Sequence, residues 1–259
     1  MRETPLEWLE RLDPRQTLRQ VMVARACGVE SSRWIQKECR RLEDMGCLEG
    51  LQCDPGSELV AGADEVGRGP MAGPLVAAAV SFRCVPWLPG LRDSKKLRPA
   101  HREALVPWIQ SQSESWSVCV VPVEVLNQPE GTIHSHSLEA MRDCVRRLIP
   151  APDRLMVDGC FNLEGLDLPQ QAVVHGDDLC LTVAAASVLA KVHRDRMMCD
   201  LDLLWPGYGF ARNKGYCTPD HLEALDRLGP CPAHRIRFEP VRASLASRDA
   251  VQGMLDLGG

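Results

Sequence analysis

The chain has 259 residues, of which 45% are hydrophobic and 25% charged, a composition typical of a globular protein with a sizeable core. Its formal net charge of −5 at pH 7 gives no overall attraction for nucleic acid, so a polyanion partner would need a local basic patch or metal ions. No apolar run predicts a membrane span, and the charged N-terminus does not resemble a signal peptide. Twelve cysteines without a C-x-x-C pair favour reduced thiols, and we expect a cytoplasmic protein.

The first 57 residues are expected to form a helical region separable from the domain over residues 58–259. Asp13 followed by Pro14 is typical of a helix N-terminus. A later helix with a stop at Gly46 is indicated by apolar residues at helical spacing, namely Ile35, Cys39, Leu42 and Met45. Basic residues occupy its other faces and fit either a solvated surface, the commoner case, or contact with a phosphate backbone; they are Arg33, Lys37, Arg40 and Arg41.

Beyond residue 58 the pattern changes to strands that later alternate with helices. Short apolar runs predict strands over 59–64, 74–82, 115–123, 154–159 and 171–177. Amphipathic or small-residue patterns predict helices over 137–149 and 181–205 and near 219–229. This order of elements predicts a mixed α/β sheet.

The segment Gly67 to Ala72 fits the dinucleotide-binding pattern G-x-G-x-x-G/A. In that motif a helix directly follows the glycines, because its N-terminus holds the pyrophosphate. Here Pro70 and Pro74 bracket the loop, and the next run is a predicted strand. The sequence therefore excludes a dinucleotide cofactor at this loop.

Acidic residues follow three of the predicted strands, as Asp64 with Glu65, as Asp158 and as Asp177. Taken singly, Asp158 could belong to a turn, and Asp177 or Asp178 could cap the next helix. Taken together, carboxylates at the strand ends of one sheet would repel one another unless cations bind between them. Oxygen ligands without His or Cys suit Mg²⁺ or Mn²⁺, and a pair of such ions serves phosphodiester hydrolysis.

Several blocks between Val60 and Val241 are similar, in order, to those of the type 2 ribonucleases H, specifically ribonuclease HII. These blocks are AGADEVGRGPMAGPLVAAAV, DSKKL, MVDG, HGDDLCLTVAAASVLAKVHRDR, NKGYCTPDHLEAL and HRIRFEPV. The resemblance implies a ribonuclease H-like mixed sheet flanked by helices, with a helical C-terminal extension. It also implies an endonuclease that cleaves the RNA strand of RNA/DNA hybrids and nicks 5′ to single ribonucleotides in duplex DNA, leaving 5′-phosphate and 3′-hydroxyl ends.

The resemblance also assigns roles to individual residues. The catalytic and metal-binding carboxylates would be Asp64, Glu65, Asp158 and Asp177, holding two Mg²⁺ or Mn²⁺ ions with Asp64 between them. The backbone of Gly67, Arg68 and Gly69 would read the ribose 2′-hydroxyl, and Tyr216 would stack on the sugar beyond the cut. Candidate phosphate contacts are Lys95, Lys96, Lys214 and Arg235, and a structural salt bridge is an equal alternative for Arg235.

Two departures from the family pattern occur near these residues: His175 stands where lysine is common, and Cys217 stands where glycine is usual. The alternatives are a ribonuclease HIII-like enzyme that acts on hybrids only, or an inactive nucleic-acid-binding relative. The glycine–arginine–glycine triplet argues against the first, and the presence of all four carboxylates argues against the second. We expect a monomer that binds nucleic acid and no membrane.

Overall fold

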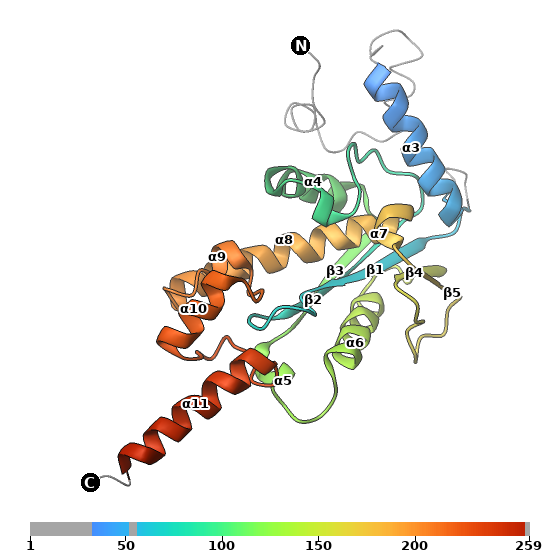
Figure 1. Ribbon diagram of the computed structural model, residues 1–259. Helices are drawn as coiled ribbons and strands as arrows, with labels where there is room; N and C mark the ends of the chain where they lie inside the picture. Colours follow the sequence, from blue (N-terminus) through green and yellow to red (C-terminus); the bar gives the residue numbers. More distant parts are fainter. Residues whose placement is uncertain (1–32, 52–55, 257–259) are drawn as a thin grey trace. The chain divides into compact units, whose positions relative to one another are not determined.

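The computed structural model describes residues 33–51 and 56–256, and the predicted helix start at Asp13 and Pro14 lies outside them. Figure 1 shows a mixed sheet flanked by helices, as the sequence predicts. The strand order is β3-β2-β1-β4-β5. The strands are β1 (Val60–Val66), β2 (Leu75–Phe82), β3 (Ser115–Val121), β4 (Arg154–Asp158) and β5 (Gln170–Val173).

The register of the parallel strands aligns two acidic positions. β1 pairs in parallel with β4, with Ala63 opposite Val157. The next residue on each strand is an acid, Asp64 on β1 and Asp158 on β4. Because parallel strands end at the same edge of a sheet, this register directs both carboxylates to one edge.

The chain divides into two compact units. The first contains the described residues up to Val66 together with 77–119 and 138–192. The second contains residues 67–76, 120–137 and those from His193 onward. The division expected from the sequence, between residues 57 and 58, stays a prediction.

Helices pack on the sheet of the first unit where small residues allow close approach. α8 (Leu181–Leu204) carries a fully buried run of alanines, and a side chain at Gly62 on β1 would collide with the backbone of Thr182 and Val183. α6 (Ile133–Arg146) contacts β2, where the Cys144 thiol lies 3.3 Å from the Ala77 carbonyl oxygen. The two helices cover opposite faces of the sheet (Figure 1).

The remaining helices of the first unit are α3 (Arg33–Glu49), α4 (Pro99–Gln112), the 3₁₀ turn η1 (Ser94–Lys96) and α7 (Gly176–Leu179). The two short ones, η1 and α7, lie beside Asp158, the acid at the end of β4. Cys39, Leu42 and Met45 of α3 are buried, which confirms the apolar face predicted from their spacing. None of the described helices is long and apolar enough to cross a membrane.

The second unit is built around two apolar clusters. One contains Tyr208 and Phe210, whose rings stack at 5.3 Å, and the other contains Met71, Leu225 and Val241. Its helices are α5 (Val123–Leu126), α9 (Phe210–Asn213), α10 (Pro219–Leu228) and α11 (Glu239–Asp256). α10 begins as its sequence predicts, with the Thr218 side chain accepting the His221 N–H and proline at the first turn.

Two expectations were wrong in detail, and one helix was missed. Gly46 does not end α3, which continues to Glu49 and stops at Gly50, whose φ of 68° suits glycine. The strand predicted over 171–177 ends at Val173, and residues 176–179 form α7. The sequence did not predict α4, which contains Pro107 and has a weak periodicity. The helix α11 belongs to the helical C-terminal extension that the family resemblance implied, although no local pattern gave its bounds.

Candidate active site

Asp64 is buried at the carboxyl edge of the sheet, with 5% of its surface exposed. It lies near the end of β1, and its Oδ1 accepts the N–H of Glu65 at 2.7 Å. Burial raises the pKa of Asp64 well above its usual range, and the neighbouring Glu65, Asp158 and Asp177 raise it further. The hydroxyl of Ser187 opposes the rise by hydrogen bonding to the carboxylate.

Asp158, the last residue of β4, connects this strand to the next element of the site. Its Oδ1 accepts the N–H of Gly176 at 2.9 Å, at the first residue of α7. The preceding residue, His175, has a left-handed backbone conformation with φ 58°. The turn after β5 is therefore shaped so that α7 begins against Asp158.

Asp177 reaches the site from α7 and not from the end of a strand, which corrects the sequence prediction. Burial raises its pKa to about 6, and the charges of Asp93 and Asp158 add to the rise. Lys95 opposes this effect, with its Nζ 3.5 Å from the Asp177 Oδ2. Within the first unit, the charges of Glu65, Asp158 and Asp177 thus act on Asp64, and that of Asp158 acts on Asp177.

One acid of this site, Asp93, was not predicted from the sequence. Ligand oxygens of Asp93, Asp177 and Asp178 lie within 4.8 Å of one another. The Asp93 side chain also accepts the N–H of Lys95 at 2.9 Å, which orders the turn η1. The signal was available, because Asp93 belongs to the same DSKKL block that supplied Lys95 and Lys96.

The site has the chemistry of a hard-cation centre. Its ligands are carboxylate oxygens, which suit divalent cations such as Mg²⁺ or Mn²⁺. Burial and the neighbouring acids raise the pKa of Asp64 and of Asp177, so the ionised carboxylates are disfavoured without a further cation. A bound dication would lower the pKa of both acids and stabilise their ionised forms. The residues present therefore fit a metal centre.

An open depression gives access to these acids. It is lined by residues of η1, β4 and the segment around α7, namely Asp93, Lys95, Lys96, Asp158, Val174, His175, Asp177, Asp178 and Leu179. The Lys95 side chain is 74% exposed, and Lys96 pairs with Asp178. Two of the three lysines predicted to contact phosphate, Lys95 and Lys96, therefore lie beside the acids and line the depression.

In the second unit, the glycine–arginine–glycine triplet lies beside Tyr216. A Cβ placed on Gly69 would lie 3.7 Å from the Tyr216 ring, and Tyr216 is 43% exposed. Gly67 has φ 99° and is packed so closely on Arg194 that a side chain there would collide with the guanidinium. The structure thus brings together the predicted 2′-hydroxyl-reading loop and the predicted sugar-stacking ring.

Arg194, which the sequence did not single out, fixes both of these loops. This residue of α8 is fully buried and donates to the carbonyl oxygens of Pro74 at 2.9 Å, Lys214 at 2.9 Å and Ala72 at 3.2 Å. Burial lowers its pKa to about 10. A guanidinium can serve three carbonyls because its donors are spread over a planar fork.

Arg235 was expected to contact phosphate or to form a structural salt bridge, and neither is seen among the described residues. Its side chain is fully buried and donates to the carbonyl oxygens of Gly73 at 2.8 Å and Arg68 at 3.3 Å, with the Phe238 ring 5.6 Å away. No described carboxylate pairs with it, and its burial leaves no surface for a phosphate. Lys214 keeps a partly exposed side chain, with its Nζ 3.3 Å from the Asp195 carbonyl oxygen.

The sequence of the chain is similar to those of known ribonucleases. The model of the family described as ribonuclease HII matches residues 61–241. The chain is 43% identical over 216 residues to the ribonuclease HII of Syntrophomonas wolfei, covering 83% of this chain and 84% of that protein. It is 47% identical over 219 residues to that of Halalkalibacterium halodurans, covering 85% and 80% of the two chains.

Solved structures share the fold. The ribonuclease HII of Archaeoglobus fulgidus, solved as a complex with PCNA, superposes with a TM-score of 0.63 at 29% identity, covering 70% of this chain and 95% of that one. A ribonuclease HIII solved with Mn²⁺ has a TM-score of 0.59 at 20% identity, covering 81% and 73%, which shows the fold alone. Given the extent of the family match, this chain belongs to the ribonuclease HII family, whose members are endonucleases that cleave the RNA strand of RNA/DNA hybrids.

Proposed function

We propose that this ribonuclease acts with two divalent cations, Mg²⁺ or Mn²⁺, held by Asp64, Glu65, Asp158 and Asp177. The observation that carries the proposal is the burial of Asp64 beside three further carboxylates, which raise its pKa well above the usual range. Bound there, the cations would supply an activated water and stabilise the leaving 3′ oxygen.

The surrounding residues prepare this site. The Gly176 N–H holds one oxygen of Asp158, and the Glu65 N–H holds one oxygen of Asp64. These hydrogen bonds fix the carboxylates before a cation arrives, so little reorganisation is needed on binding. Lys95 is near enough to Asp177 to hold its carboxylate in the ionised form that a cation requires.

We also propose that the substrate includes duplex DNA with a single embedded ribonucleotide, nicked on the 5′ side. Support comes from the second unit, where the exposed Gly69 faces the Tyr216 ring. A glycine backbone allows close approach to a 2′-hydroxyl, and an aromatic ring can stack on the neighbouring sugar. Neither group requires more than one ribonucleotide, which favours this activity over the hybrid-only alternative. The cytoplasmic location and monomeric state belong to the same proposal.

The decisive experiment measures cleavage of three duplexes of equal length by the purified protein. Each is incubated with Mg²⁺, with Mn²⁺ or with a chelator. One duplex contains a single ribonucleotide, one is an RNA/DNA hybrid, and one is all DNA. We expect metal-dependent nicking 5′ to the lone ribonucleotide and cleavage of the hybrid, with the all-DNA duplex intact. Cleavage of the hybrid alone would support the ribonuclease HIII-like alternative, and binding without any cleavage would support the inactive one.

A further inference from the structure

α3 is fixed to the rest of the first unit by two of its glutamates, Glu38 and Glu49. Near its start, the Glu38 Oε1 accepts the N–H of Gly90 at 2.5 Å. At its end, the Glu49 carboxylate accepts the N–H groups of Leu181 at 2.6 Å and Thr182 at 3.0 Å. Both glutamates are buried, so the faces that α3 leaves in solvent have a fixed position in this unit.

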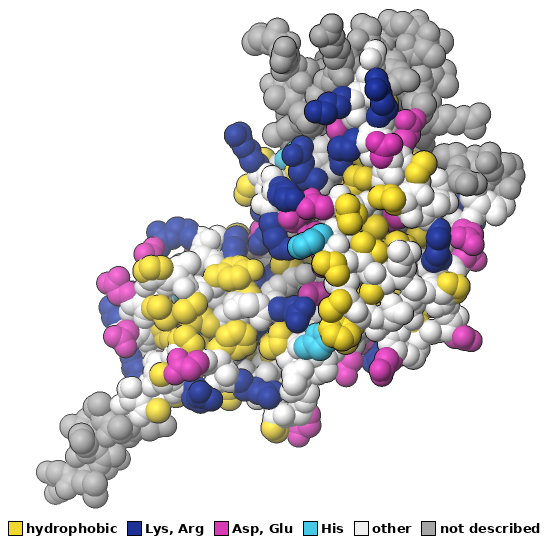
Figure 2. All heavy atoms as spheres, turned by 45° about the vertical axis from the view of Figure 1, so that its right-hand side comes forward, with side chains coloured by type: hydrophobic (Ala, Val, Ile, Leu, Met, Phe, Trp, Pro, Cys, Tyr) yellow, Lys and Arg dark blue, Asp and Glu magenta, His cyan; other side chains and the backbone are white. Residues whose placement is uncertain are grey.

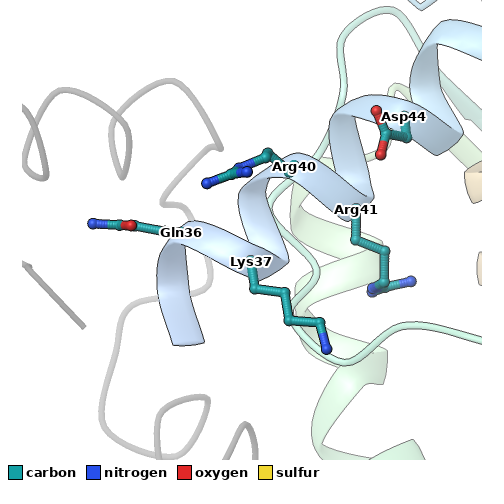
Figure 3. Close-up of a pocket in the computed structure, with 5 residues that line it drawn as sticks. All are labelled: Gln36, Lys37, Arg40, Arg41 and Asp44. Carbon is teal, nitrogen blue, oxygen red and sulfur yellow. The ribbon is translucent and has the colours of Figure 1, made fainter. Parts of the chain in front are cut away.

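The outer surface of α3 is basic. Lys37, Arg40 and Arg41 recur at helical spacing, and Figure 3 shows Lys37 and Arg41 projecting from the same side of the helix. Arg41 is neutralised by Glu38 at 2.5 Å. Within the described part of the chain, Lys37 and Arg40 form no ion pair, and both are exposed. With Arg92 in the adjacent loop, we call these four residues the α3 basic surface.

The α3 basic surface is continuous with the active-site depression. A second depression shares Lys96 and Asp178 with the one that Asp158 and Asp177 line; its lining residues are Lys37, Glu38, Arg41, Arg92, Lys96 and Asp178. A third, lined by Gln36, Lys37, Arg40, Arg41 and Asp44, shares Lys37 and Arg41 with the second. Figure 2 shows Lys and Arg side chains gathered on the upper part of the molecule, with Asp and Glu side chains among them.

We propose that the α3 basic surface binds the phosphate backbone of the substrate duplex, beyond the nucleotides that the active site contacts. This inference rests on the proposed function, because the substrate that enters the depression must be a nucleic acid. Exposed cations in a chain of net charge −5 concentrate the attraction for a polyanion at one place. Their hollowed surface leads directly from Lys96 and the catalytic acids, which gives the backbone a continuous path.

The test is the double substitution Lys37→Gln with Arg40→Gln, which removes two charges from exposed helix positions and keeps good helix formers. The matched control is Arg147→Gln, an exposed arginine just after α6 that lines none of the three depressions. Binding is measured on an all-DNA duplex of about 30 base pairs, which offers phosphates without a cleavable ribonucleotide, at about 50 and about 200 mM salt.

Two lost phosphate contacts should make the slope of log affinity against log salt shallower by about 1.8, because each contact contributes about 0.9. Affinity at the lower salt should fall by about ten-fold, and the loss of affinity between the two salts should be about ten-fold smaller than for the parent. On a ribonucleotide-containing duplex of the same length, KM should rise while kcat stays unchanged. The control should match the parent.

A double variant with the affinity and salt slope of the Arg147→Gln control overturns the inference and leaves α3 with a merely solvated face. If the parent binds the duplex but never cleaves, the proposed function fails, and the binding arm still decides the role of the α3 basic surface. Circular dichroism of the double variant checks that α3 is intact, so a loss of affinity is not a loss of structure.

Discussion

Glu49, the last residue of α3, caps the N-terminus of α8 by accepting the N–H of Leu181 at 2.6 Å. Its other oxygen accepts the N–H and the hydroxyl of Thr182. The first N–H groups of a helix have no partner inside the helix, and a carboxylate also interacts favourably with the positive end of the helix dipole. A residue from the N-terminal region thereby fixes the start of the helix that carries Ser187 and Arg194.

Glu49→Gln should change how stability depends on pH. Burial raises the pKa of Glu49 to about 7 from an ordinary 4.5, so the folded state binds this proton more tightly than the unfolded state. The free energy of unfolding should therefore fall as pH rises from about 4.5 to about 7, by at most about 3 kcal/mol. Glutamine does not titrate, so the parent should lose stability relative to the variant across this window.

The measurement is urea unfolding of parent and variant at several values between about pH 4.5 and about pH 8. Other acids titrate equally in both proteins, so only the difference between the two profiles is interpreted. Parallel profiles would mean that Glu49 stays ionised throughout, held by its three hydrogen bonds and the helix dipole.

Asp64→Asn should abolish most activity and, without metal, raise stability. The substitution removes a negative charge from the metal site, so cleavage should fall by at least about 100-fold while duplex binding persists. It also removes the repulsion from Glu65, Asp158 and Asp177, so the metal-free Tm should increase.

Cleavage rates and Tm are measured with and without Mg²⁺, with Asp167→Asn, an exposed acid outside the site, as control. Metal should raise the Tm of the parent and the control more than that of Asp64→Asn. Normal turnover of Asp64→Asn at saturating metal would remove this residue from the site.

Arg194→Lys should destabilise the protein although it keeps the charge. The guanidinium serves three carbonyl oxygens, and a lysine ammonium cannot reach all of them from the same position. Leaving buried carbonyls without partners should lower the free energy of unfolding by about 2–4 kcal/mol. The exposed pair of Arg212 with Asp220 offers the control Arg212→Lys, which should be nearly neutral. Equal unfolding midpoints for the two variants would mean that the hydrogen bonds of Arg194 to the three carbonyl oxygens do not stabilise the fold.

The sequence was informative where local pattern determines structure. Apolar runs ending in acid predicted β1 and β4, because a buried strand that ends at a sheet edge has this composition. The same reasoning predicted β5 with too many residues. No local pattern indicates that His175 adopts a φ of 58° and that α7 begins after it. The helix α4 escaped prediction because Pro107 interrupts its pattern.

Hydrogen-bond partners that are distant in the sequence could not be predicted from local patterns. Arg194 and Arg235 are both buried arginines whose acceptors are backbone carbonyls distant in sequence, and no local motif encodes such acceptors. Asp93 could have been predicted, because it belongs to the DSKKL block that was already singled out for Lys95 and Lys96. For Arg235 the sequence analysis gave a phosphate contact or a salt bridge, whereas its side chain donates to the carbonyl oxygens of Gly73 and Arg68.

Tyr216→Ala should impair cleavage most where a single ribonucleotide is the only feature to recognise. The ring is 43% exposed and faces Gly69, so it is available to stack on a sugar next to the 2′-hydroxyl. Loss of such a platform costs about 1–3 kcal/mol by analogy with base–aromatic stacking, or roughly 5- to 150-fold in kcat/KM. A long hybrid presents many equivalent ribonucleotides and further backbone contacts, so its deficit should be smaller.

The measurement is the ratio of kcat/KM on a single-ribonucleotide duplex to that on a hybrid of equal length, for parent, Tyr216→Ala and Tyr216→Phe. Phenylalanine keeps the ring and loses only the hydroxyl, so its ratio should stay near that of the parent. Gly69→Val offers a contrast, because a side chain beside the ring would hold every ribonucleotide away from the backbone and lower activity on both substrates alike. If Tyr216→Ala keeps the parent ratio, the ring has only a packing role, and recognition of the junction belongs to other residues.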